Sequence, residues 1–255
     1  LARYDFPLDR FQLEAIDALD AGEHVIVAAP TGSGKTVVAE YGIAAALRDG
    51  RRAFYTAPIK ALSNQKFHDL AEIHGDGAVG LLTGDNSING DAPAVVMTTE
   101  VLRNMIYAQR DLDDLAVVVL DEVHYLQDAY RGPVWEEVII HLPHHVQLVC
   151  LSATVSNTAE LADWIETVRG PTRAVIEDRR PVQLDNLYYV NDVTNDKLRL
   201  LPTIVDGRPN ADALRLDASA VRFRRNRRDD RNPKGSGQRT LATPTRVDTV
   251  EELHE

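Results

Sequence analysis

The sequence predicts an α/β fold, in which a mostly parallel β-sheet carries helices on both of its faces. Two observations carry this prediction. A short apolar run at residues 25–28 leads through a turn of small residues into a helix-compatible run that starts at residue 37. A second run, residues 115–120, is apolar at every position, which is typical of a strand buried on both faces of a parallel sheet. Strand, turn and helix in this order are the units from which such a sheet is built.

The turn after the first strand has the composition of a phosphate-binding loop. Residues 29–36 read Ala-Pro-Thr-Gly-Ser-Gly-Lys-Thr. Backbone N–H groups at a helix N-terminus converge on a phosphate only where side chains are small. Lys35 would reach the β and γ phosphates of ATP, and the Thr36 hydroxyl would take a place on Mg²⁺. Ala29 stands where the usual pattern has Gly, yet it is small enough for the same turn. The candidate ATP-binding residues here are Pro30, Thr31, Gly32, Ser33, Gly34, Lys35 and Thr36.

The alternative is a Gly-rich turn that binds nothing, and the strand before it and the helix after it argue against that alternative.

Two carboxylates follow the second apolar run, Asp121 and Glu122. Acidic side chains directly after a buried strand are costly unless they have partners or a chemical role. With a phosphate loop upstream, we expect Asp121 to hold Mg²⁺, directly or through water, and Glu122 to orient and deprotonate the attacking water. Elsewhere an Asp-Glu pair would usually be a solvated turn.

Further strands and helices are predicted between and after these motifs. The expected strands are residues 53–57, 79–82, 95–97, 146–151 and 173–176, and the expected helices are residues 37–49, 135–142 and a segment around 161–165. The first of these strands stops at Pro58 and turns into a helix, which places Lys60, Asn64 and Gln65 at the carboxyl edge of the sheet, where ligands bind in open α/β sheets.

Two other strand ends suit contacts with a nucleic-acid backbone. They read Thr83-Gly84-Asp85 and Thr98-Thr99-Glu100, and both offer hydroxyl and turn N–H groups. Thr and Gly also end many strands for turn reasons alone, so each signal is weak by itself.

Gln12 and a group of histidines each have two interpretations. Gln12 precedes an amphipathic helix and follows Phe11, so it could contact the edge of an adenine, or it could be a solvated side chain. His141, His144 and His145 have a spacing seen in metal sites. We reject a metal site there, because Pro143 interrupts the helix that would align them and no Cys or carboxylate completes a ligand set.

Composition bounds the class of protein. Hydrophobic residues make up 44% and charged residues 26% of the 255 residues, which is ordinary for a globular protein. No run of 18 apolar residues and no secretory signal is present, so we expect a cytoplasmic protein without a membrane span. The net charge of −11 is the wrong sign for binding nucleic acid by bulk attraction, so any such contact must be local.

The composition changes after about residue 202. Arginines gather between residues 222 and 239 beside Pro, Gly and Ser, with few apolar residues. This predicts a linker with a basic, disordered insertion. The insertion is either a solvated loop or a flexible arm that touches phosphates.

The ordered set of motifs resembles the superfamily-two helicases of the DEVH-box, superkiller-like group, and especially the exosome-associated RNA helicases and their bacterial relatives. The similarity covers about residues 4–189. It rests on Phe11-Gln12, residues 29–36, residues 57–65, Thr83 to Asp85, Thr98 to Glu100, Asp121 to Leu126 followed by residues 131–137, and Ser152-Ala153-Thr154.

This resemblance implies a RecA-like P-loop fold and the first RecA-like domain of an ATP-dependent helicase that moves along single-stranded nucleic acid, with RNA favoured over DNA. It places Gln12 near the adenine, and it gives His124, Ser152 and Thr154 the task of coupling nucleotide state to the nucleic-acid groove. The implied groove residues are Pro58, Lys60, Asn64, Gln65, Thr83, Gly84, Thr98, Thr99 and Arg103. A DNA helicase of the same superfamily and a P-loop ATPase unrelated to nucleic acid remain as alternatives.

The resemblance also implies a second RecA-like domain in cis that supplies arginine fingers. We expect residues 1–190 to be the first domain, residues 191–246 the linker with its basic insertion, and residues 247–255 the start of a truncated second domain. Because an arginine supplied by the second domain accelerates phosphoryl transfer strongly, we expect the 255 residues alone to bind ATP weakly and to hydrolyse it very slowly.

Overall fold

The computed structural model describes residues 4, 6–153, 157–182, 186–192 and 197–211, and the chain divides into two compact units, residues 1–182 and residues 183–255. The division falls eight residues before the boundary expected from the sequence at residue 190. The basic insertion and residues 247–255 lie outside the described residues.

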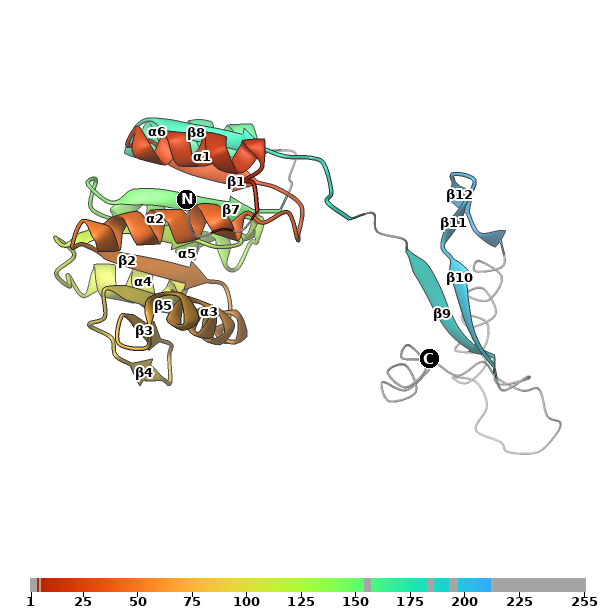
Figure 1. Ribbon diagram of the computed structural model, residues 1–255, viewed down its shortest axis with the longest axis horizontal. Helices are drawn as coiled ribbons and strands as arrows, with labels where there is room; N and C mark the ends of the chain where they lie inside the picture. Colours follow the sequence, from red (N-terminus) through yellow and green to blue (C-terminus); the bar gives the residue numbers. More distant parts are fainter. Residues whose placement is uncertain (1–3, 5, 154–156, 183–185, 193–196, 212–255) are drawn as a thin grey trace. The chain divides into compact units, whose positions relative to one another are not determined.

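One β-sheet forms the centre of the first unit (Figure 1). Its strand order is β4-β3-β5-β2-β6-β7-β1-β8, and every pairing is parallel except that of β3 with β4. The strands are β1 (His24–Ala28), β2 (Arg52–Ala57), β3 (Val79–Leu82), β4 (Ser87–Ile88), β5 (Ala94–Thr98), β6 (Leu115–Leu120), β7 (Gln147–Ser152) and β8 (Thr172–Ile176).

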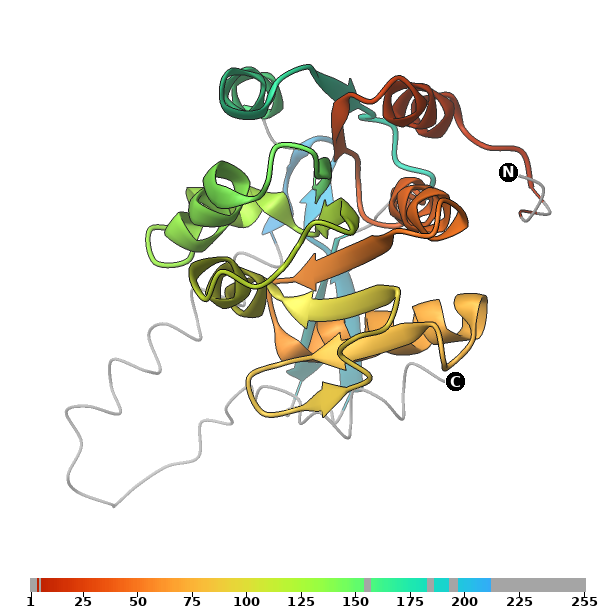
Figure 2. The same cartoon turned by 90° about the vertical axis from the view of Figure 1, so that its left-hand side faces the viewer.

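Helices cover both faces of this sheet, as Figure 2 shows. The helices are α1 (Arg10–Asp20), α2 (Thr36–Arg48), α3 (Lys60–His74), α4 (Thr99–Tyr107), the short 3₁₀ helix η1 (Val123–Gln127), α5 (Gly132–His141) and α6 (Thr158–Arg169). Buried residues of α1, α2 and α3 belong to one hydrophobic cluster, and those of α4, η1, α5 and α6 to a second.

The central strands alternate between the two clusters. In β6, Val117 and Val119 belong to the first cluster, whereas Val118 and Leu120 belong to the second. Successive side chains of a strand point to opposite faces, so a strand covered by helices on both sides must be apolar throughout. This is why residues 115–120 form a continuous apolar run.

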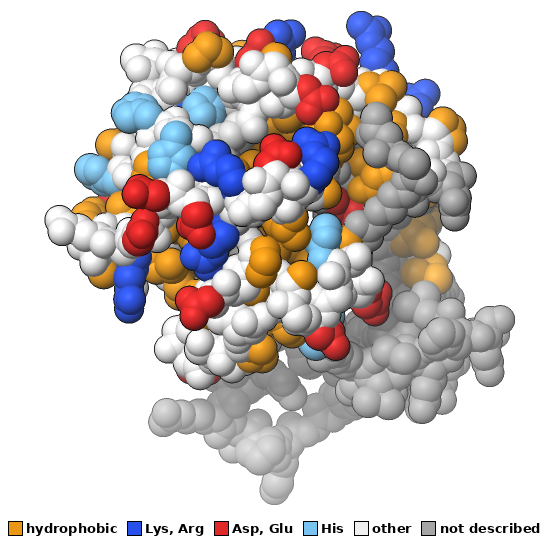
Figure 3. Space-filling model, turned by 60° about the vertical axis from the view of Figure 1, so that its left-hand side comes forward, with side chains coloured by type: hydrophobic (Ala, Val, Ile, Leu, Met, Phe, Trp, Pro, Cys, Tyr) orange, Lys and Arg blue, Asp and Glu red, His pale blue; other side chains and the backbone are white. Residues whose placement is uncertain are grey.

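The surface of the first unit carries charges of both signs. On the face drawn in Figure 3, Lys and Arg side chains lie among Asp and Glu side chains and do not form one broad basic area. The net charge of the whole chain is −11, and on this face any attraction of a polyanion would have to come from a few individual residues.

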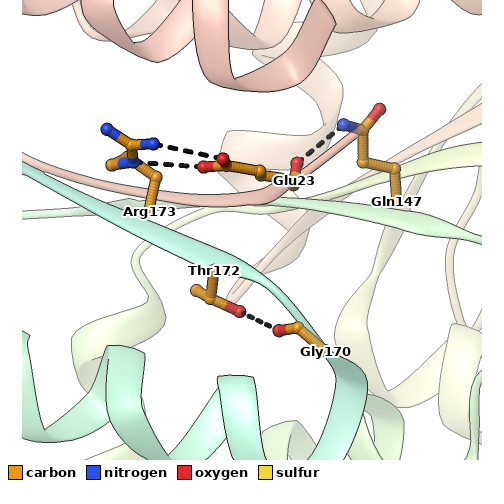
Figure 4. A network of polar contacts seen from close by, with 5 residues as sticks. All are labelled: Glu23, Gln147, Gly170, Thr172 and Arg173. Atoms are coloured by element: carbon orange, nitrogen blue, oxygen red, sulfur yellow. Dashed lines mark hydrogen bonds and ion pairs between the residues drawn. The ribbon is translucent and has the colours of Figure 1, made fainter. Parts of the chain in front are cut away.

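Polar contacts connect residues at the amino ends of β1, β7 and β8 (Figure 4). The phosphate loop lies at the opposite edge of the sheet, after the carboxyl end of β1. The guanidinium of Arg173 donates to both carboxylate oxygens of Glu23 at 3.1 Å, and the Gln147 amide donates to the Glu23 carbonyl at 2.7 Å. The Thr172 hydroxyl donates to the Gly170 carbonyl at 2.8 Å. The bonds to Glu23 join the starts of β1, β7 and β8.

The second unit contains two antiparallel strand pairs within its described residues. β9 (Leu187–Asp192) pairs with β10 (Lys197–Pro202), and β11 (Ile204–Val205) pairs with β12 (Arg208–Pro209). Part of the stretch expected to be a linker is therefore strand. β11 and β12 have two residues each, which is too few to show a period.

The expected elements of the first unit are confirmed within a few residues, and β3 and β6 have the expected bounds. The helix expected from residue 135 begins at Gly132, because Pro133 fits the first turn of a helix. Within the described part of the chain, no helix is long and apolar enough to cross a membrane.

Candidate functional site

The phosphate loop connects β1 to α2 and bends at two glycines. Gly32 and Gly34 both have φ of +83°, a backbone conformation that side chains with a Cβ rarely adopt. A Cβ on Gly34 would also lie 2.8 Å from Nε2 of Gln12. The loop therefore requires glycine at both places, which explains the pattern found in the sequence.

Lys35 is the last residue before α2, and its side chain folds back onto the loop. Its Nζ atom donates to the Ala29 carbonyl at 3.1 Å. Ser33 is buried, and its hydroxyl has no hydrogen-bond partner among the described residues. A cationic amine, an unpartnered hydroxyl and a helix N-terminus form a set of donors that suits a phosphate group.

Gln12 lies inside the first turn of α1 and is buried, whereas the sequence analysis placed it just before the helix. Its Nε2 atom donates to the Gly34 carbonyl at 2.9 Å, and its Oε1 atom accepts from the Asp9 backbone N–H at 2.8 Å. The side chain therefore joins the N-terminus of α1 to the phosphate loop. It is not a solvated residue.

Asp121 and Glu122 follow β6 as expected. The Asp121 N–H donates to the Thr56 carbonyl at 3.0 Å, which continues the pairing with β2. Both carboxylate oxygens of Asp121 accept hydrogen bonds. Oδ2 accepts from the Tyr55 hydroxyl at 2.6 Å, and Oδ1 accepts from the Glu122 N–H at 2.9 Å.

The surroundings of Asp121 have two unusual features. Burial, together with the neighbouring Asp121 carboxylate, raises the pKa of Tyr55 well above its usual value of 10.0, so its hydroxyl remains a donor at neutral pH. Glu122 has φ of +52°, which is uncommon for a residue other than glycine and turns the chain sharply from β6 into η1.

His124 is connected both to Glu122 and to a stack of aromatic rings. Its Nδ1 atom lies 3.2 Å from Oε2 of Glu122, within ion-pair distance but without hydrogen-bond geometry. Its ring stacks on Tyr125 with centroids 5.1 Å apart, and Tyr125 stacks on Trp135 at 5.8 Å. The Arg131 guanidinium lies over the Tyr125 ring, 5.5 Å from its centroid. Tyr125 and Trp135 belong to the stretches that carry the family resemblance, but the stacking of their rings is not evident from the sequence.

Strand register brings the phosphate loop and the carboxylates to the same edge. Leu120 of β6 and Ile26 of β1 are both paired with Cys150 of β7. Asp121 and the end of β1 are therefore level, and they are separated by two strand spacings, about 10 Å. The loop also touches β7, because the Ala29 N–H donates to the Ser152 carbonyl at 3.2 Å.

The buried hydroxyl of Ser152 has no hydrogen-bond partner among the described residues. Thr154, the other strand-end residue predicted to couple nucleotide state to the groove, lies outside them.

The predicted groove residues lie around the ends of β2, β3 and β5, which are neighbours in the sheet. Asp85 joins two of them, since its carboxylate accepts from Lys60 Nζ at 2.5 Å and from the Thr83 hydroxyl at 3.1 Å. These two bonds lower the pKa of Asp85. Asp85 therefore stays charged and holds both partners.

Other groove residues differ in how accessible they are. Gln65 and Gly84 are exposed, while Asn64, Thr98 and Arg103 are half-buried. Pro58 and Thr99 are buried, so their side chains do not face solvent in this structure. Arg103 Nε lies 3.8 Å from Oε2 of Glu137.

The model of the DEAD/DEAH box helicase family matches residues 9–162. That match covers more than half of the chain. The chain belongs to the DEAD/DEAH box helicase family.

Proteins of the superkiller-like group are similar to this helicase domain. "Probable helicase HelY" of Mycobacterium tuberculosis is 50% identical over 93% of this chain and 26% of its own length. "Antiviral helicase SKI2" of Saccharomyces cerevisiae is 53% identical over 71% of this chain and 14% of its own length. "ATP-dependent RNA helicase mtr4" of Schizosaccharomyces pombe is 46% identical over 81% of this chain and 18% of its own length. The chain thus spans about a quarter or less of these relatives.

Solved structures share the fold of this helicase domain. The structure of the helicase MrfA bound to DNA and AMPPNP superimposes with a TM-score of 0.61, at 23% identity, over 88% of this chain and 33% of that one. At this level of identity the likeness concerns the fold alone, which confirms the RecA-like α/β architecture.

Tyr55 and Asp85 are the site neighbours whose contacts the sequence reasoning missed. Tyr55 looks like any aromatic residue of a buried strand. One signal could have revealed it, because a tyrosine inside a buried strand needs a partner for its hydroxyl. Asp85 was noted only as part of a strand-end motif, since its position beside Lys60 depends on the pairing of distant strands.

Proposed function

We propose that this chain is the ATP-binding half of an ATP-dependent nucleic-acid helicase, which couples ATP hydrolysis to translocation on single-stranded RNA and to duplex unwinding. One observation carries the proposal. A glycine-dependent phosphate loop ending in Lys35 and the pair Asp121–Glu122 lie level at one edge of the sheet. Membership of the DEAD/DEAH box family supports it and leaves the unrelated P-loop ATPase without support.

Each residue of the nucleotide site has a role in this proposal. Lys35 leaves the Ala29 carbonyl and binds the β and γ phosphates, while residues 31–34 supply N–H donors. The oxygens of Thr36 and Asp121 suit Mg²⁺, which prefers oxygen ligands and keeps several waters. When bound, Mg²⁺ neutralises charge on the phosphate oxygens. Glu122 orients the attacking water and accepts its proton.

Gln12 would contact the adenine through the N–H and the lone pair that its two internal bonds leave free. The same Gln12 amide donates to the Gly34 carbonyl. Adenine binding and the geometry of the phosphate loop would therefore both depend on Gln12.

Coupling to the nucleic acid would run through His124, Ser152 and Thr154. The contact of His124 with Glu122 and the bond from the Ala29 N–H to the Ser152 carbonyl support this assignment. The groove residues would bind the backbone of the nucleic acid and not its bases, so binding would depend little on sequence.

RNA is favoured over DNA because a relative is named as an RNA helicase. DNA remains the alternative, since telling the two apart depends on contacts to the 2′-OH group. We further propose that a second RecA-like domain in cis completes the motor, which the greater length of the relatives supports. The 255 residues alone would then hydrolyse ATP slowly. A cytoplasmic location stays a prediction.

The deciding experiment is the ATPase activity of the full-length protein with single-stranded RNA, with single-stranded DNA of the same sequence, and with neither. We expect stimulation by RNA, and a loss of turnover by orders of magnitude in Glu122→Gln, because the water would lose its base. Stimulation by DNA alone would favour the DNA helicase. Activity indifferent to both polymers, or an active Glu122→Gln variant, would contradict the proposal.

A further inference from the structure

Tyr55 is a polar residue in one of the least polar places of the molecule. It belongs to β2, in the middle of the sheet, and only 2% of it is exposed. Its ring packs in the cluster that contains Val119 and Ala57. Phe54, the preceding residue, is fully buried on the other face without any hydroxyl. Phenylalanine at residue 55 would fill the same space in the core. Packing therefore does not explain why the side chain carries a hydroxyl.

The Tyr55 hydroxyl donates to Oδ2 of Asp121 at 2.6 Å. This length is typical of a hydrogen bond from a hydroxyl to a carboxylate, which is about twice as strong as one between neutral groups. Strand pairing sets the geometry, since Tyr55 is level with Val119 and the Asp121 N–H binds the Thr56 carbonyl. The two residues meet because β2 and β6 are neighbours in the sheet.

A second bond completes the hold on the carboxylate. Oδ1 of Asp121 accepts from the Glu122 N–H at 2.9 Å. The terminal torsion of an aspartate is otherwise soft, so two donors on different oxygens are needed to fix the plane of the group. Each oxygen keeps a further lone pair. The carboxylate is thus held in one orientation with acceptor capacity to spare.

We propose that Tyr55 is a positioning residue that holds the Asp121 carboxylate in the orientation required to bind Mg²⁺ or its water. This inference rests on the proposed function, in which Asp121 is a magnesium ligand. In this proposal Tyr55 itself would touch neither the metal nor the nucleotide. Partners of this kind, which orient a metal ligand from behind, change metal affinity about 10- to 100-fold when they are removed.

Tyr55→Phe removes only the hydroxyl and keeps the ring that the core requires. The probe is a fluorescent ATP analogue, titrated into the 255-residue chain over a range of Mg²⁺ concentrations and in EDTA. We expect the Mg²⁺ concentration that gives half of the maximal affinity gain to rise about tenfold or more. The affinity measured in EDTA should be unchanged, because the phosphate loop is intact.

Tyr41→Phe is the matched control. The Tyr41 hydroxyl donates to Asp20 at 2.7 Å, so this variant also removes a tyrosine–aspartate hydrogen bond, but one between α1 and α2 and away from the carboxylates. It should leave the Mg²⁺ dependence of binding unchanged. Thermal unfolding of both variants shows whether the fold is retained.

Asp121→Asn provides a second measurement that separates positioning from structural damage. If Tyr55 acts through Asp121, adding Tyr55→Phe to Asp121→Asn should not weaken Mg²⁺-dependent binding further. Additive losses would overturn the inference, as would a Tyr55→Phe variant with unchanged Mg²⁺ dependence or with equal losses in Mg²⁺ and in EDTA. A wild-type chain that binds no nucleotide would overturn the proposed function as well, which distinguishes the two failures.

Discussion

Side chains of the nucleotide site already have partners within the protein. Lys35 is bound to the Ala29 carbonyl and Asp121 to Tyr55. Under the proposed function, ligand binding at Lys35 would therefore be an exchange, in which a charged phosphate replaces a neutral acceptor. A hydrogen bond between charged groups is stronger than one to a neutral carbonyl, so the exchange favours the ligand.

Lys35→Ala should weaken nucleotide binding about 10- to 100-fold, which corresponds to the loss of one or two charge-assisted hydrogen bonds. Titration of a fluorescent ATP analogue into the 255-residue chain measures the change. Lys66→Ala is the control, since Lys66 forms an ion pair with Asp69 on α3 and has no role in the site. Equal affinities of wild type and Lys35→Ala would show that the loop does not bind phosphate.

His24 makes the fold sensitive to pH. It is buried at the start of β1, where its Nδ1 atom accepts from the Leu148 N–H at 3.0 Å. Burial lowers the pKa of His24 below 6.5, so the unfolded chain binds a proton at a higher pH than the folded chain does. Stability that this histidine contributes is therefore complete above pH 6.5 and falls as the pH drops from there toward the lower folded-state pKa.

We expect the unfolding free energy of wild type, relative to that of His24→Asn, to decrease as the pH falls below 6.5. The reason is that histidine at residue 24 takes up a proton in this pH range, whereas asparagine does not. Asparagine keeps an acceptor side chain without a titrating group. Urea unfolding of both proteins at several values between about pH 5 and pH 8 tests this expectation. A constant difference over that interval would contradict it.

At the scale of the elements, one glycine sets the junction between η1 and α5. A Cβ on Gly132 would lie 2.3 Å from the carbonyl oxygen of Leu126, and the Gly132 N–H donates to the Asp128 carbonyl at 2.8 Å. The 3₁₀ helix that carries His124 thus packs directly against the first turn of α5.

Gly132→Ala should destabilise the protein by about 1–3 kcal/mol, as expected for overpacking against a backbone that cannot move away freely. It should also lower the ATPase activity of the full-length protein, because η1 has to shift. Gly77→Ala is the control, since a Cβ there would meet nothing within 4 Å. Denaturant unfolding measures the stabilities, and equal values for the two variants would refute the clash.

The sequence predicted the elements whose pattern is local. Residues 79–82 and 115–120 are apolar runs with turn residues after them, and they are strands within those bounds. The segment around Thr99 was taken as a strand end only, although α4 begins there, because Thr suits both turns and helix starts. β4 and η1 were not predicted, since two or five residues are too few to show a period.

The candidate site was predicted where residue type and spacing are enough, as in the phosphate loop. The burial of Gln12 and the bond from Tyr55 to Asp121 were not predicted. Both contacts join residues far apart in sequence, 22 positions for Gln12 and Gly34 and 66 for Tyr55 and Asp121. Such contacts depend on which strands become neighbours, and a pattern within one segment holds no information about that.

At the scale of the whole molecule, the two hydrophobic clusters lie entirely within the first unit. Their buried members run from Phe11 to Val175, and the unit ends at Val182. Every residue of the nucleotide site also lies within it. A domain needs its own core to fold alone, and this unit has one on each face of the sheet.

A polypeptide that ends at residue 182 should therefore fold on its own. Its affinity for nucleotide should equal that of the 255-residue chain within about twofold, because the free-energy contributions of separate units are additive. Thermal unfolding and the titration with a fluorescent ATP analogue compare the two. A truncated chain that fails to fold or binds much more weakly would show that residues 183–255 stabilise the site.

The carboxylate of Asp85 has a consequence for selectivity between ligands. It accepts hydrogen bonds from the ammonium group of Lys60 and the hydroxyl of Thr83. In the proposed groove, an incoming phosphate would therefore have to displace an anion that the protein itself supplies. A single phosphate, as in a free nucleotide, competes poorly with a tethered carboxylate. A long strand brings many phosphates at once and compensates through its other contacts. If Lys60 and Thr83 bind a nucleic-acid backbone as proposed, Asp85 would act as a built-in competitor that favours long strands over small anions.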